Sequence, residues 1–439
     1  MTPISEFLPF TPTSDQLTAL ENIEHFLDDD RQFLVLKGSA GTGKTSLVKA
    51  VSQSLREKDV VFYMAAPTAR AANVMQRKTG TEAKTIHSMI YQPEPLKNKP
   101  GVQLNLADNS YNMPAIYIVD EASMISNTLT NSGQFVASAP LLEDLVKYVL
   151  MGHPANKILF IGDPYQLPPV GKDKRSPAME AQYLGQQFGL KGSTVSLDTV
   201  MRQAEDSPIL SLATALKDYM KQGKIYGDIR TKKAANTDLA IKTYLKHFSF
   251  EQPGKITMIG WRNKEIEWWN RTIRQAIGLG KDWLVKNDLL STQQNWYHEN
   301  EGWIAKGTTV RVLELDKKVE HFADLKFMQA QLLVEESRKV EAKVMIDSLG
   351  TRYGNLEPKK ETALYHRVMK TNKTFRNSNN IKDDPYLSAM RLQYAYGNTC
   401  HKAQGGEWDY VILHPVYNKE LRWLYTAVTR ARKDICTWG

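Results

Sequence analysis

Hydrophobic residues in the first 200 positions fall into short apolar runs separated by helix-length amphipathic stretches. Five runs have the character of strands that end in polar or glycine-bearing loops, at residues 33–38, 60–68, 115–123, 157–164 and 194–200. Continuous apolar strands with helix-length segments between them are typical of a parallel sheet covered on both faces. Ligands of such sheets bind at the carboxyl ends of the strands, so the loops after these runs are the first places to look for functional residues.

A second group of apolar runs lies in the C-terminal half, at residues 255–263, 392–400 and 408–416. Residues 291–389 differ, because apolar runs there alternate with charged stretches and a polar loop follows at 372–384. This pattern indicates a small β-rich insertion. The two groups of runs together predict an α/β protein with two parallel-sheet domains and one β-rich insertion.

The composition is that of a folded protein with a basic balance. Hydrophobic residues make up 42% of the chain and charged residues 24%, which argues against disorder as the dominant state. Lys and Arg number 57 against 48 Asp and Glu, and the net charge of +9 favours polyanionic partners without identifying one. Two cysteines and the absence of a long apolar stretch favour a reducing, cytoplasmic setting with no membrane partner.

The stretch KGSAGTGKTS at residues 37–46 matches the phosphate-binding loop pattern G-x-x-x-x-G-K-[ST]. It follows the apolar run at 33–36 and precedes a helix-like segment at 45–55. Glycines in this pattern let backbone N–H groups wrap around phosphates, the lysine reaches the β- and γ-phosphate oxygens, and the hydroxyl of Thr45 suits Mg²⁺. The sequence therefore predicts a nucleoside triphosphate site.

Two adjacent carboxylates, Asp120 and Glu121, follow the apolar run that ends at residue 119. At a strand end near a phosphate loop, the first can hold Mg²⁺ and the second can orient or deprotonate an attacking water. The second carboxylate argues against a kinase, whose phosphoryl acceptor is a substrate hydroxyl. The guanine-reading N-K-x-D element of switch GTPases is absent from the sequence. Hydrolysis of the triphosphate as fuel is the leading hypothesis.

Two weaker signals lie farther along the chain. Gln166, in GDPYQLPPVG at residues 162–171, can sense a γ-phosphate and relay its loss to a proline-stiffened loop. Arg430 and Arg432, in LYTAVTRARKD at residues 424–434, can neutralise charge that develops during phosphoryl transfer. A basic helix end near a terminus is more often simply solvated, so the arginines gain meaning only from the other motifs.

Taken in order, these stretches resemble the motif series of superfamily 1 helicases, most closely the RecD and phage Dda branch. The series spans nearly the whole chain and is far more specific than any single motif. Its members are TSDQLTAL, GSAGTGKTS, AAPTARAA, TIHS, DEAS, GDPYQLPPVG, TVMRQ, NTCHKAQGGEWD and YTAVTRAR. The resemblance implies two RecA-like phosphate-loop motor domains, parallel sheets flanked by helices, with a small hairpin insertion and a β-rich, SH3-like insertion.

The resemblance also implies roles at the nucleotide for residues of the N-terminal motifs. Gln16 would read adenine, while Lys44 and Thr45 would serve the phosphates and Mg²⁺. Asp120 and Glu121 would be the carboxylates for the metal and for the attacking water. The implied cofactors are ATP and Mg²⁺, with Thr45 and Asp120 as the metal ligands.

Motifs in the remainder of the chain would complete that site. Gln166 would sense the γ-phosphate, and Arg202 and Arg430 would reach the phosphates from the second motor domain. Gln404 and Gly405 are expected near the nucleotide and the hinge. The full set expected to bind ATP is Gln16, Gly38, Gly41, Gly43, Lys44, Thr45, Ser46, Gln404 and Gly405.

A further group of polar side chains is expected to contact a nucleic-acid strand that lies across both motor domains. Hydroxyls, backbone amides and cations suit phosphodiester oxygens and do not read sequence. The residues that match the strand-contacting motifs are Pro67, Thr68, Arg70, Thr85, His87, Thr399, His401 and Lys402.

The implied domains are a motor domain over residues 1–180, a second motor domain over 181–290 and 390–439, and an SH3-like domain over 291–389. A pin-type hairpin is expected at about 89–113, where Tyr91 and Tyr111 are candidates for a wedge that splits the duplex, although an ordinary packed tyrosine is the commoner role for either.

The activity implied is that of an ATP-dependent DNA helicase that moves 5′ to 3′, by analogy with its branch, and acts as a monomer on single-stranded and fork DNA. The compact motif set resembles phage replication or recombination helicases, for which a single-strand-binding protein is a candidate partner. Two alternatives stay open: an RNA helicase of the same superfamily, and a nucleotide-gated module that binds nucleic acid without moving.

Overall fold

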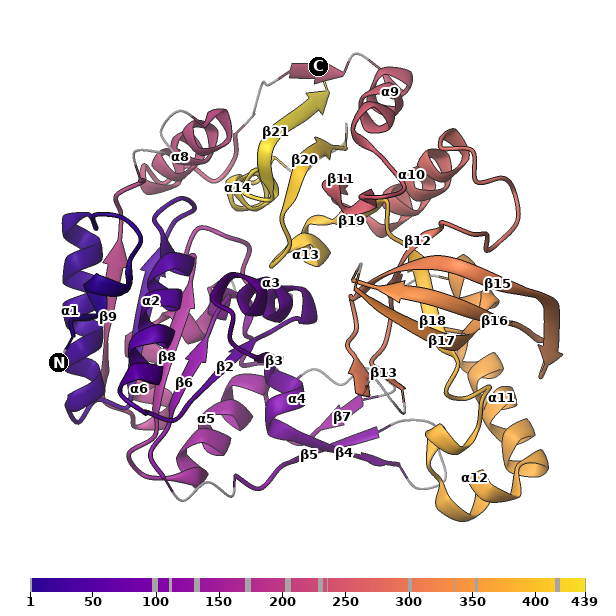
Figure 1. Cartoon of the computed structure of the whole chain (residues 1–439), viewed down its shortest axis with the longest axis horizontal. Coiled ribbons are helices and arrows are strands. Elements are labelled where there is room, and N and C mark those ends of the chain that lie inside the picture. The colour runs from indigo at the N-terminus through magenta and orange to yellow at the C-terminus, as the bar shows by residue number, and fades with distance from the viewer. Residues whose placement is uncertain are drawn as a thin grey trace.

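The computed structural model of the chain describes residues 2–96, 102–109, 113–129, 135–169, 175–201, 207–227, 232–234, 236–298, 302–335, 337–351, 354–414 and 419–438. Figure 1 shows three parts: a parallel-sheet lobe at the left, a second lobe at the top and a β-barrel at the right. A small hairpin sheet extends from the first lobe towards the helices attached to the barrel (Figure 1).

Six strands form the sheet of the first lobe, in the order β3-β2-β6-β8-β1-β9, and all neighbours run parallel. They are β1 (Phe33–Gly38), β2 (Phe62–Ala66), β3 (Ala83–Thr85), β6 (Ile116–Val119), β8 (Lys157–Gly162) and β9 (Gly192–Leu197). Strands β6 and β8 are buried at every position. This is the burial expected of continuous apolar strands that are covered on both faces.

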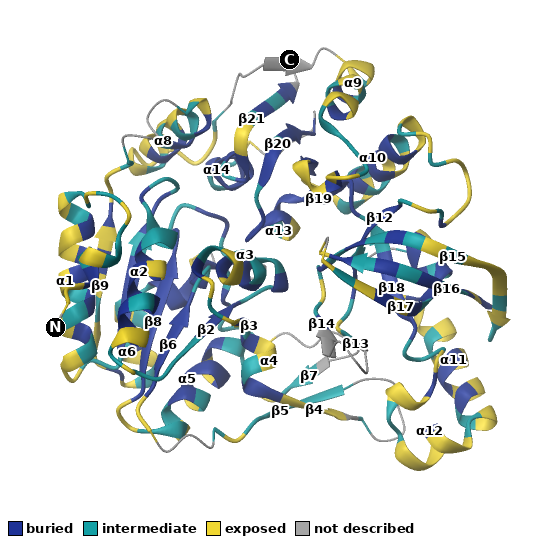
Figure 2. Cartoon of the chain, in the orientation of Figure 1, coloured by how far each residue is buried: buried dark blue, intermediate teal, exposed yellow. Residues whose placement is uncertain are grey.

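Helices cover both faces of this sheet, and their apolar sides form two separate cores. One face holds η1 (Ile4–Phe7), α1 (Ser14–Asp28), α2 (Lys44–Glu57) and α3 (Ala69–Thr79). The other holds α4 (Ile86–Ile90), η2 (Ala122–Met124), α5 (Leu141–Gly152), η3 (Pro177–Met179) and α6 (Ala181–Phe188). Figure 2 shows the strands dark and the outer helix sides exposed, so each helix is amphipathic in the way its sequence predicts.

The hairpin sheet consists of β4 (Tyr91–Pro95) paired antiparallel with β5 (Val102–Leu106), and β7 (Phe135–Ala137) beside β5. Tyr91, at its base, is 7% exposed, and its hydroxyl donates to Asp144 Oδ2 at 2.6 Å. It is therefore a packed residue of the first lobe and not an exposed wedge. Tyr111, the other wedge candidate, lies outside the described residues.

The second lobe has a five-stranded parallel sheet in the order β10-β21-β20-β11-β19. Its strands are β10 (Lys232–Ala234), β11 (Ile256–Gly260), β19 (Gly397–Thr399), β20 (Trp408–Leu413) and β21 (Ala431–Trp438). Two apolar cores form around it, one with α8 (Pro208–Lys221), α13 (Cys400–Ala403) and α14 (Leu421–Val428), the other with α9 (Thr237–His247) and α10 (Asn263–Ala276). The short helix η4 (Pro253–Lys255) leads into β11.

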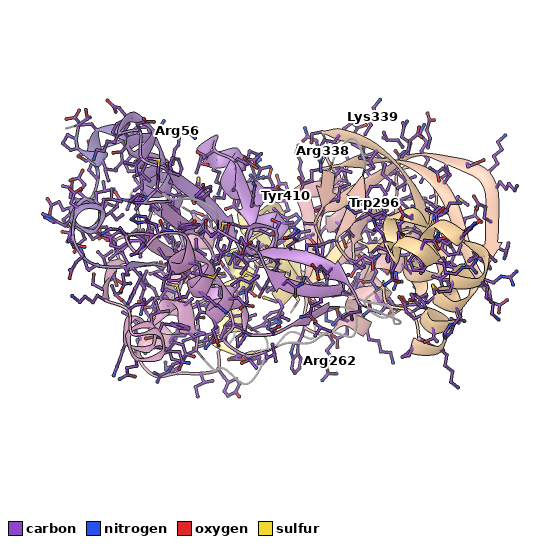
Figure 3. All side chains as sticks on the ribbon, turned by 90° about the horizontal axis from the view of Figure 1, so that it is seen from below. Arg56, Arg262, Trp296, Arg338, Lys339 and Tyr410 are labelled. Carbon is purple, nitrogen blue, oxygen red and sulfur yellow. The ribbon has the colours of Figure 1, made fainter. Side chains whose placement is uncertain are left out.

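The insertion is a closed barrel of five strands, β12-β15-β16-β17-β18. They are β12 (Leu289–Thr292), β15 (Thr309–Phe322), β16 (Leu325–Val334), β17 (Arg338–Met345) and β18 (Met390–Tyr394), with the short pair β13 (Trp296–His298) and β14 (Gly302–Ile304) attached. In Figure 3, Trp296 lies in the barrel part of the molecule and Arg338 and Lys339 on its outer side. The indole Nε1 of Trp296 donates to Ser388 O at 2.7 Å, which ties the short pair to the chain that enters β18.

Between β17 and β18 the chain forms η5 (Ile346–Gly350), α11 (Pro358–Thr371), α12 (Lys373–Ser378) and η7 (Ile381–Asp383). These helices pack on one end of the barrel through a core that includes Phe327, Leu364 and Phe375. Asn379, directly after α12, donates its amide to the carbonyl oxygen of Leu96 at 3.0 Å. The end of the hairpin strand β4 therefore meets the insertion directly.

The strands divide the chain somewhat differently from the expected domain bounds. Strand β9 and helix α6 follow residue 180 but belong to the first lobe, because β9 pairs with the open edge of β1. The barrel takes its first and last strands from residues 289–292 and 390–394, on both sides of the expected insertion at 291–389. Among the described residues, no helix is both long and apolar enough to cross a membrane.

Candidate nucleotide site and nucleic-acid interface

The phosphate loop joins the end of β1 to the start of α2, and Lys44 is the first residue of that helix. Lys44 Nζ donates to the carbonyl oxygens of Gly38 and Ser39 at 2.7 and 2.9 Å. Gly43 has a φ of +85°, and a Cβ there would lie 2.6 Å from the Gln16 side-chain nitrogen. Only glycine fits this position without displacing the loop. The N-terminus of α2 directly after a glycine-bearing loop is the arrangement that binds anions through backbone N–H groups.

The remaining loop residues line the same turn. Gly41 also adopts a positive φ, of +80°, and Thr45 and Ser46 lie half-buried in the first turn of α2. Their hydroxyls are thus on the helix end that faces the loop. Gln16 is fully buried in α1, donates to Thr42 O at 2.9 Å and accepts from Thr13 N at 3.0 Å. Both ends of its amide are engaged with protein, one of them with the phosphate loop itself.

Asp120 and Glu121 lie where β6 ends, on a strand two places from β1 in the sheet. Glu121 has a left-handed backbone, with φ +50°, a conformation that is uncommon for a residue with a side chain and that is found at functional turns. Burial raises the pKa of Glu121 to about 7, and the charge of Asp120 adds to the effect, while Arg430 and Lys44 oppose it. A carboxyl poised near neutrality suits proton transfer from water.

Thr45 and Asp120 fit Mg²⁺ in chemistry, because a hydroxyl and a carboxylate oxygen are the hard donors that this ion takes. Burial raises the pKa of Asp120, so a bound cation is what would keep this carboxyl ionised. Within the described residues no group of three or more His, Cys, Asp or Glu side chains could form a metal cage. One carboxylate, one hydroxyl and phosphate oxygens are nevertheless the usual way in which proteins hold Mg²⁺ with a nucleotide.

The loop after β8 brings Asp163 and Gln166 to the same region. Asp163 is 1% exposed, and its Oδ1 accepts from Tyr165 N at 3.0 Å. Gln166 is 5% exposed, and its side-chain oxygen has no hydrogen-bond partner among the described residues. A buried amide oxygen without a donor is costly, so Gln166 has capacity for a water or a ligand group.

Tyr425, on α14 of the second lobe, contacts two parts of the nucleotide site at once. Its hydroxyl donates to Asp163 Oδ2 at 2.7 Å and accepts from the Ala40 amide of the phosphate loop at 2.8 Å. Tyr425 is 1% exposed. The hydroxyl thus links the loop after β1, the loop after β8 and the second lobe in one hydrogen-bonded chain.

Other side chains of α14 extend this contact. Arg422 Nη1 donates to the carbonyl oxygens of Pro164 and Gln166 at 2.6 and 3.2 Å. Thr426 Oγ1 accepts from Leu167 N at 2.8 Å, and Leu167 packs in the apolar core of the second lobe. The loop after β8 is therefore hydrogen-bonded directly to the second lobe.

The arginines proposed for the phosphates differ in their surroundings. Arg430 is 5% exposed, donates to Thr426 O and Gly406 O at 3.1 and 3.2 Å, and its charge acts on Glu121. Arg432 instead is paired with Asp409 Oδ1 at 2.6 Å and turns away from the site. Arg202 lies outside the described residues. The residue before it, Met201, donates its amide to Gly41 O at 3.1 Å, so this segment starts against the phosphate loop.

Gln404 and Gly405 lie where the second lobe meets the first. Gln404 is 4% exposed, and its Nε2 donates to Leu167 O at 2.9 Å. Gly405 has a φ of +72°, and a Cβ there would come within 2.7 Å of Ala71 Cβ on α3. This glycine allows the two lobes to approach closely beside the nucleotide site.

The expected strand-contacting residues of the first lobe follow β2 and β3, which are adjacent parallel strands. Pro67 is half-buried before α3, and Thr68 caps that helix by accepting from Ala71 N at 3.2 Å. Thr85 caps α4 by accepting from Ser88 N at 3.1 Å, and His87 is exposed in the first turn. The caps leave the helix N-termini at the sheet edge, where backbone amides suit phosphate oxygens.

Thr399, His401 and Lys402 follow β19 in the second lobe. A small cavity of about 50 Å³ is lined there by polar side chains of α10, the barrel and the second lobe, among them Asn263, Asn270, Ser291, Asn398, Thr399 and Lys402. The Lys402 side chain is exposed between the second lobe and the barrel. Its pKa is lowered to about 8, mainly because the surrounding protein partly desolvates the ammonium group and secondly because of the charge of Lys306. The positive charges of Lys402 and Lys306 act on one another at this place, which favours the binding of an anion there.

Arg70 occupies the junction of all three parts of the molecule. Its guanidinium lies over the Trp408 ring at 4.9 Å and donates to Lys402 O at 3.4 Å and Thr309 Oγ1 at 3.5 Å. Burial lowers the pKa of Arg70 to about 10, against the opposing charge of Glu335. Arg70, which is expected to contact the nucleic-acid strand, thus also joins α3 to the second lobe and the barrel.

Three side chains of these sites were not singled out from the sequence: Lys217 and Tyr425 at the nucleotide site, and Lys306 beside Lys402 between the second lobe and the barrel. Tyr425 lies in the motif YTAVTRAR, in which a role was predicted for the arginines and not for the tyrosine. Lys217 and Lys306 stand in ordinary amphipathic or loop surroundings, and no local pattern distinguishes them from solvated lysines.

Family models match two segments of the chain. Residues 13–230 match a model described as an AAA domain, and residues 394–435 match a UvrD-like helicase C-terminal domain. These segments contain the phosphate loop and the α14 motif respectively. The segment between them includes the barrel.

Two named relatives align along most of the chain. The ATP-dependent RecD2 DNA helicase of Deinococcus radiodurans is 25% identical over 422 residues, which cover 93% of this chain and 47% of that protein. The ATP-dependent DNA helicase dda of Enterobacteria phage T4 is 22% identical over 458 residues, which cover 96% of this chain and 98% of that protein. The chain thus spans less than half of the first relative and nearly all of the second.

Solved structures of Pif1 helicases share the fold. A structure of two coordinating Pif1 helicases at forked double-stranded DNA has a TM-score of 0.54 at 16% identity and covers 98% of this chain and 92% of its own. The Pif1 helicase from Bacteroides in complex with ADP-AlF3 and single-stranded DNA has a TM-score of 0.52 at 15% identity, with the same coverage of 98% and 92%. At this identity the likeness describes the fold: RecA-like parallel-sheet domains with an added β-barrel.

Proposed function

The chain belongs to the superfamily 1 helicases of the RecD, Dda and Pif1 branch, and from that premise we propose that it is an ATP-driven motor that moves along single-stranded DNA and unwinds duplex DNA. The observation on which this rests is the Tyr425 hydroxyl, which contacts both Ala40 and Asp163 from the second lobe. A nucleotide site closed by a second lobe is what a motor needs and a simple phosphatase does not.

In this function the first lobe holds the nucleotide and the metal. Lys44 contacts the β- and γ-phosphates, and the glycine-bearing loop wraps the phosphates with its amides. Thr45 and Asp120 hold Mg²⁺, which when bound would neutralise phosphate charge and orient the terminal phosphate. Glu121 orients the attacking water and accepts its proton, and its raised pKa suits that exchange.

The second lobe and the loop after β8 complete the site. Gln166 lies in that loop, its amide oxygen has no hydrogen-bond partner among the described residues, and it is the proposed sensor of the γ-phosphate and its water. Arg430 provides a positive charge, and its stabilising effect increases as negative charge develops on the transferred phosphoryl group. Arg202 follows Met201, which is bound to the loop, and is assigned the same task on the strength of the motif. Gln16, Gly38, Gly41, Gly43, Ser46, Gln404 and Gly405 are assigned to the nucleotide or to the joint between lobes.

Motion follows from contacts that depend on the nucleotide. Where residues of one lobe touch a phosphate held by the other, ATP favours the closed arrangement, and loss of the γ-phosphate removes that preference. The contacts of α14 with the loop after β8 are the described route by which a change at the phosphates reaches the second lobe. Each cycle would shift the strand-contacting edge of one lobe against the other.

The proposed track runs along the carboxyl ends of β2, β3 and β19. Thr68, Thr85 and the helix N-termini behind them offer hydroxyls and amides, and Pro67, Arg70, His87, Thr399 and His401 lie along the same edges. Lys402 and Lys306 add positive charge between the second lobe and the barrel. Such groups bind the phosphodiester backbone and leave the base sequence unread.

The finer features of this proposal are a 5′ to 3′ direction, action as a monomer on single-stranded and fork DNA, and work in phage-type DNA replication or recombination beside a single-strand-binding protein. The alignment with a phage T4 DNA helicase along nearly its whole length supports the phage setting. The direction, the monomeric action and the partner protein rest on the resemblance of the motif series to the RecD and Dda branch. The hairpin that meets α12 through Leu96 and Asn379 is the proposed strand-splitting element.

The first experiment is steady-state ATP hydrolysis with and without single-stranded DNA, with single-stranded RNA in parallel, for the wild type and Lys44→Ala. We expect DNA to stimulate turnover and Lys44→Ala to abolish it. Equal stimulation by RNA would support an RNA helicase instead. ATP-dependent strand binding without turnover above background would support a gated binding module.

Unwinding and direction are tested next on duplexes with a single tail. A motor that moves 5′ to 3′ separates the substrate with a 5′ tail and leaves the one with a 3′ tail intact. The reverse preference would overturn the direction while leaving the motor in place.

A further inference from the structure

Lys217 is a buried lysine on α8 that points at the phosphate loop. It is 5% exposed, and its Nζ donates to Ser39 Oγ at 3.2 Å, across 178 positions of sequence. The same helix also touches the loop about two turns earlier, because a Cβ on Gly41 would lie 3.0 Å from Leu210. Helix α8 therefore packs directly against the nucleotide cradle.

The ammonium group of Lys217 has little to compensate for its burial. Within the described residues, the Ser39 hydroxyl is its hydrogen-bond partner and no Asp or Glu forms an ion pair with it. Lys221, one turn later, is by contrast exposed and lies 3.6 Å from Asp198 Oδ1. A buried cation without an anion is unfavourable, so this position in the fold is suited to a negatively charged ligand.

The position of Ser39 identifies which part of a nucleotide would lie there. Lys44 Nζ, the group that reaches the β- and γ-phosphates in such loops, donates to Ser39 O at 2.9 Å. Lys217 Nζ meets the side chain of that same residue. The two ammonium groups therefore approach one end of the cradle from opposite lobes, because α8 packs with α14 in the core of the second lobe.

We propose that Lys217 is a phosphate-binding residue that α8 brings to the γ-phosphate of the bound nucleotide. The proposal rests on the proposed function, since it requires a triphosphate in the loop. It adds a cation to the three already assigned to the phosphates, Lys44, Arg202 and Arg430, and makes α8 a part of the second lobe that distinguishes ATP from ADP. Loss of the γ-phosphate would leave Lys217 with only the Ser39 hydroxyl.

The test is direct binding of AMP-PNP and of ADP, each with Mg²⁺ and without DNA, by titration calorimetry. Lys217→Met keeps the aliphatic stem and removes the charge. We expect it to weaken AMP-PNP binding by about 10- to 100-fold, the usual worth of a hydrogen bond to a charged group, while ADP binding stays within about twofold. Lys217→Arg should keep the preference for AMP-PNP, and Lys221→Met should change neither affinity.

Equal weakening of both nucleotides by Lys217→Met, or no weakening of AMP-PNP, would overturn the assignment and leave Lys217 as a support of the loop. The wild type offers an independent measurement: reductive methylation of Lys217, read by mass spectrometry, should be slowed by AMP-PNP more than by ADP, with Lys221 as the internal reference. Equal rates with the two nucleotides would contradict the proposal even if the Met variant does not fold.

These outcomes separate the proposal from the motor function. If the wild type binds AMP-PNP but DNA does not stimulate hydrolysis, the motor is overturned, and the Lys217 contact is still judged by its binding data. If the wild type binds neither nucleotide, both are overturned.

Discussion

The hydroxyl of Tyr425 donates to Asp163 Oδ2 at 2.7 Å, although the two residues are 262 positions apart and belong to different lobes. The same oxygen accepts from the Ala40 amide in the phosphate loop. A neutral hydroxyl that contacts a buried carboxylate and a loop amide holds both at fixed distances from the second lobe. Closure of the lobes and the geometry of the nucleotide site are therefore linked through one oxygen atom.

Tyr425→Phe removes that oxygen and leaves the ring in its core. A hydrogen bond to a charged group contributes about 1.5–3 kcal/mol. The closed arrangement of the lobes loses this contribution in the variant and is then stabilised by the nucleotide contacts without it. We expect nucleotide affinity to change little and DNA-stimulated hydrolysis to fall about tenfold, which corresponds to the lower part of that range. Turnover against DNA concentration, measured with nucleotide binding, checks this.

Tyr219→Phe is the matched control, because Tyr219 is 42% exposed on α8 and its ring lies under the Lys224 ammonium. It should leave both quantities unchanged. If Tyr425→Phe weakens nucleotide binding and leaves turnover per bound nucleotide intact, the hydroxyl shapes the loop and does not link the lobes.

Glu121→Gln tests the assignment of the water-activating group. The amide keeps the size and hydrogen-bonding reach of the side chain but cannot accept a proton, so hydrolysis should fall by about 10²- to 10⁴-fold, the range for loss of a general base. Nucleotide binding should persist. Glu82→Gln, at an exposed residue beside Lys84, serves as the control. Retained turnover in Glu121→Gln would show that another group activates the attacking water.

The pKa of Lys402, lowered to about 8, predicts that strand binding depends on pH. Below that pH the ammonium is charged and attracts phosphates, and above it the free protein loses the charge. Affinity for a labelled single-stranded oligonucleotide, measured by anisotropy at fixed salt, should therefore fall as the pH rises from about 7 to about 9.

Lys402→Met should weaken binding at neutral pH, flatten that pH dependence and reduce the salt slope by about one. Lys191→Met removes an exposed lysine that pairs with Asp30 near β9, away from the proposed track, and should preserve both dependences. An unaltered pH profile in Lys402→Met would show that another group titrates.

The pair of Arg274 and Asp288 joins α10 to the entrance of the barrel, and both side chains are almost fully buried. Arg274 Nε and Nη2 donate to the two carboxylate oxygens at 2.5 and 2.9 Å. Arg274→Met leaves the buried Asp288 carboxylate without its cationic partner and should lower the free energy of unfolding by about 3–5 kcal/mol. Arg271→Met, which breaks the exposed pair with Glu267 on the same helix, should cost about 0.5 kcal/mol or less.

Calorimetric unfolding of the two variants beside the wild type measures the difference. Similar transition temperatures for Arg274→Met and Arg271→Met would mean that the joint between second lobe and barrel does not depend on the buried pair.

Local pattern located five of the six strands of the first sheet, and β11 and β20 of the second, because buried parallel strands must be apolar along their length. The short strands β3 and β10 and the C-terminal strand β21 were not predicted. The runs at 115–119 and 157–162 became β6 and β8, buried throughout. The same reasoning grouped the run at 194–200, which forms β9, with the first sheet, but the expected domain boundary at residue 180 was wrong because it placed β9 in the second motor domain. Its pairing with β1 depends on which edge of the first sheet is open, and that is a property of the assembled fold. Strand β12 at 289–292 was not among the predicted runs, and the run predicted at 392–400 is divided between β18 of the barrel and β19 of the second lobe.

At the site, the phosphate loop and the Asp120–Glu121 pair were predictable because each is a short segment whose chemistry follows from adjacent residues. Tyr91 was predicted as a candidate wedge, but its hydroxyl donates to Asp144 Oδ2 inside the first lobe. Arg70 was expected on the strand, and the structure also places its guanidinium over Trp408, across the lobe boundary. Such assignments depend on what a side chain meets, and sequence spacing alone does not contain that information.

The sequence by itself determined that this protein has two apolar parallel sheets, a phosphate loop with its carboxylates, and a motif series of one helicase branch. Those features are local: a strand needs its own apolar residues and a phosphate loop its own glycines. Only the tertiary structure decided that Tyr425 meets Ala40 across 385 positions and that Lys217 meets Ser39 across 178. Contacts between residues so far apart arise when the two lobes pack together, and the free energy of that packing is shared among all the surfaces it buries.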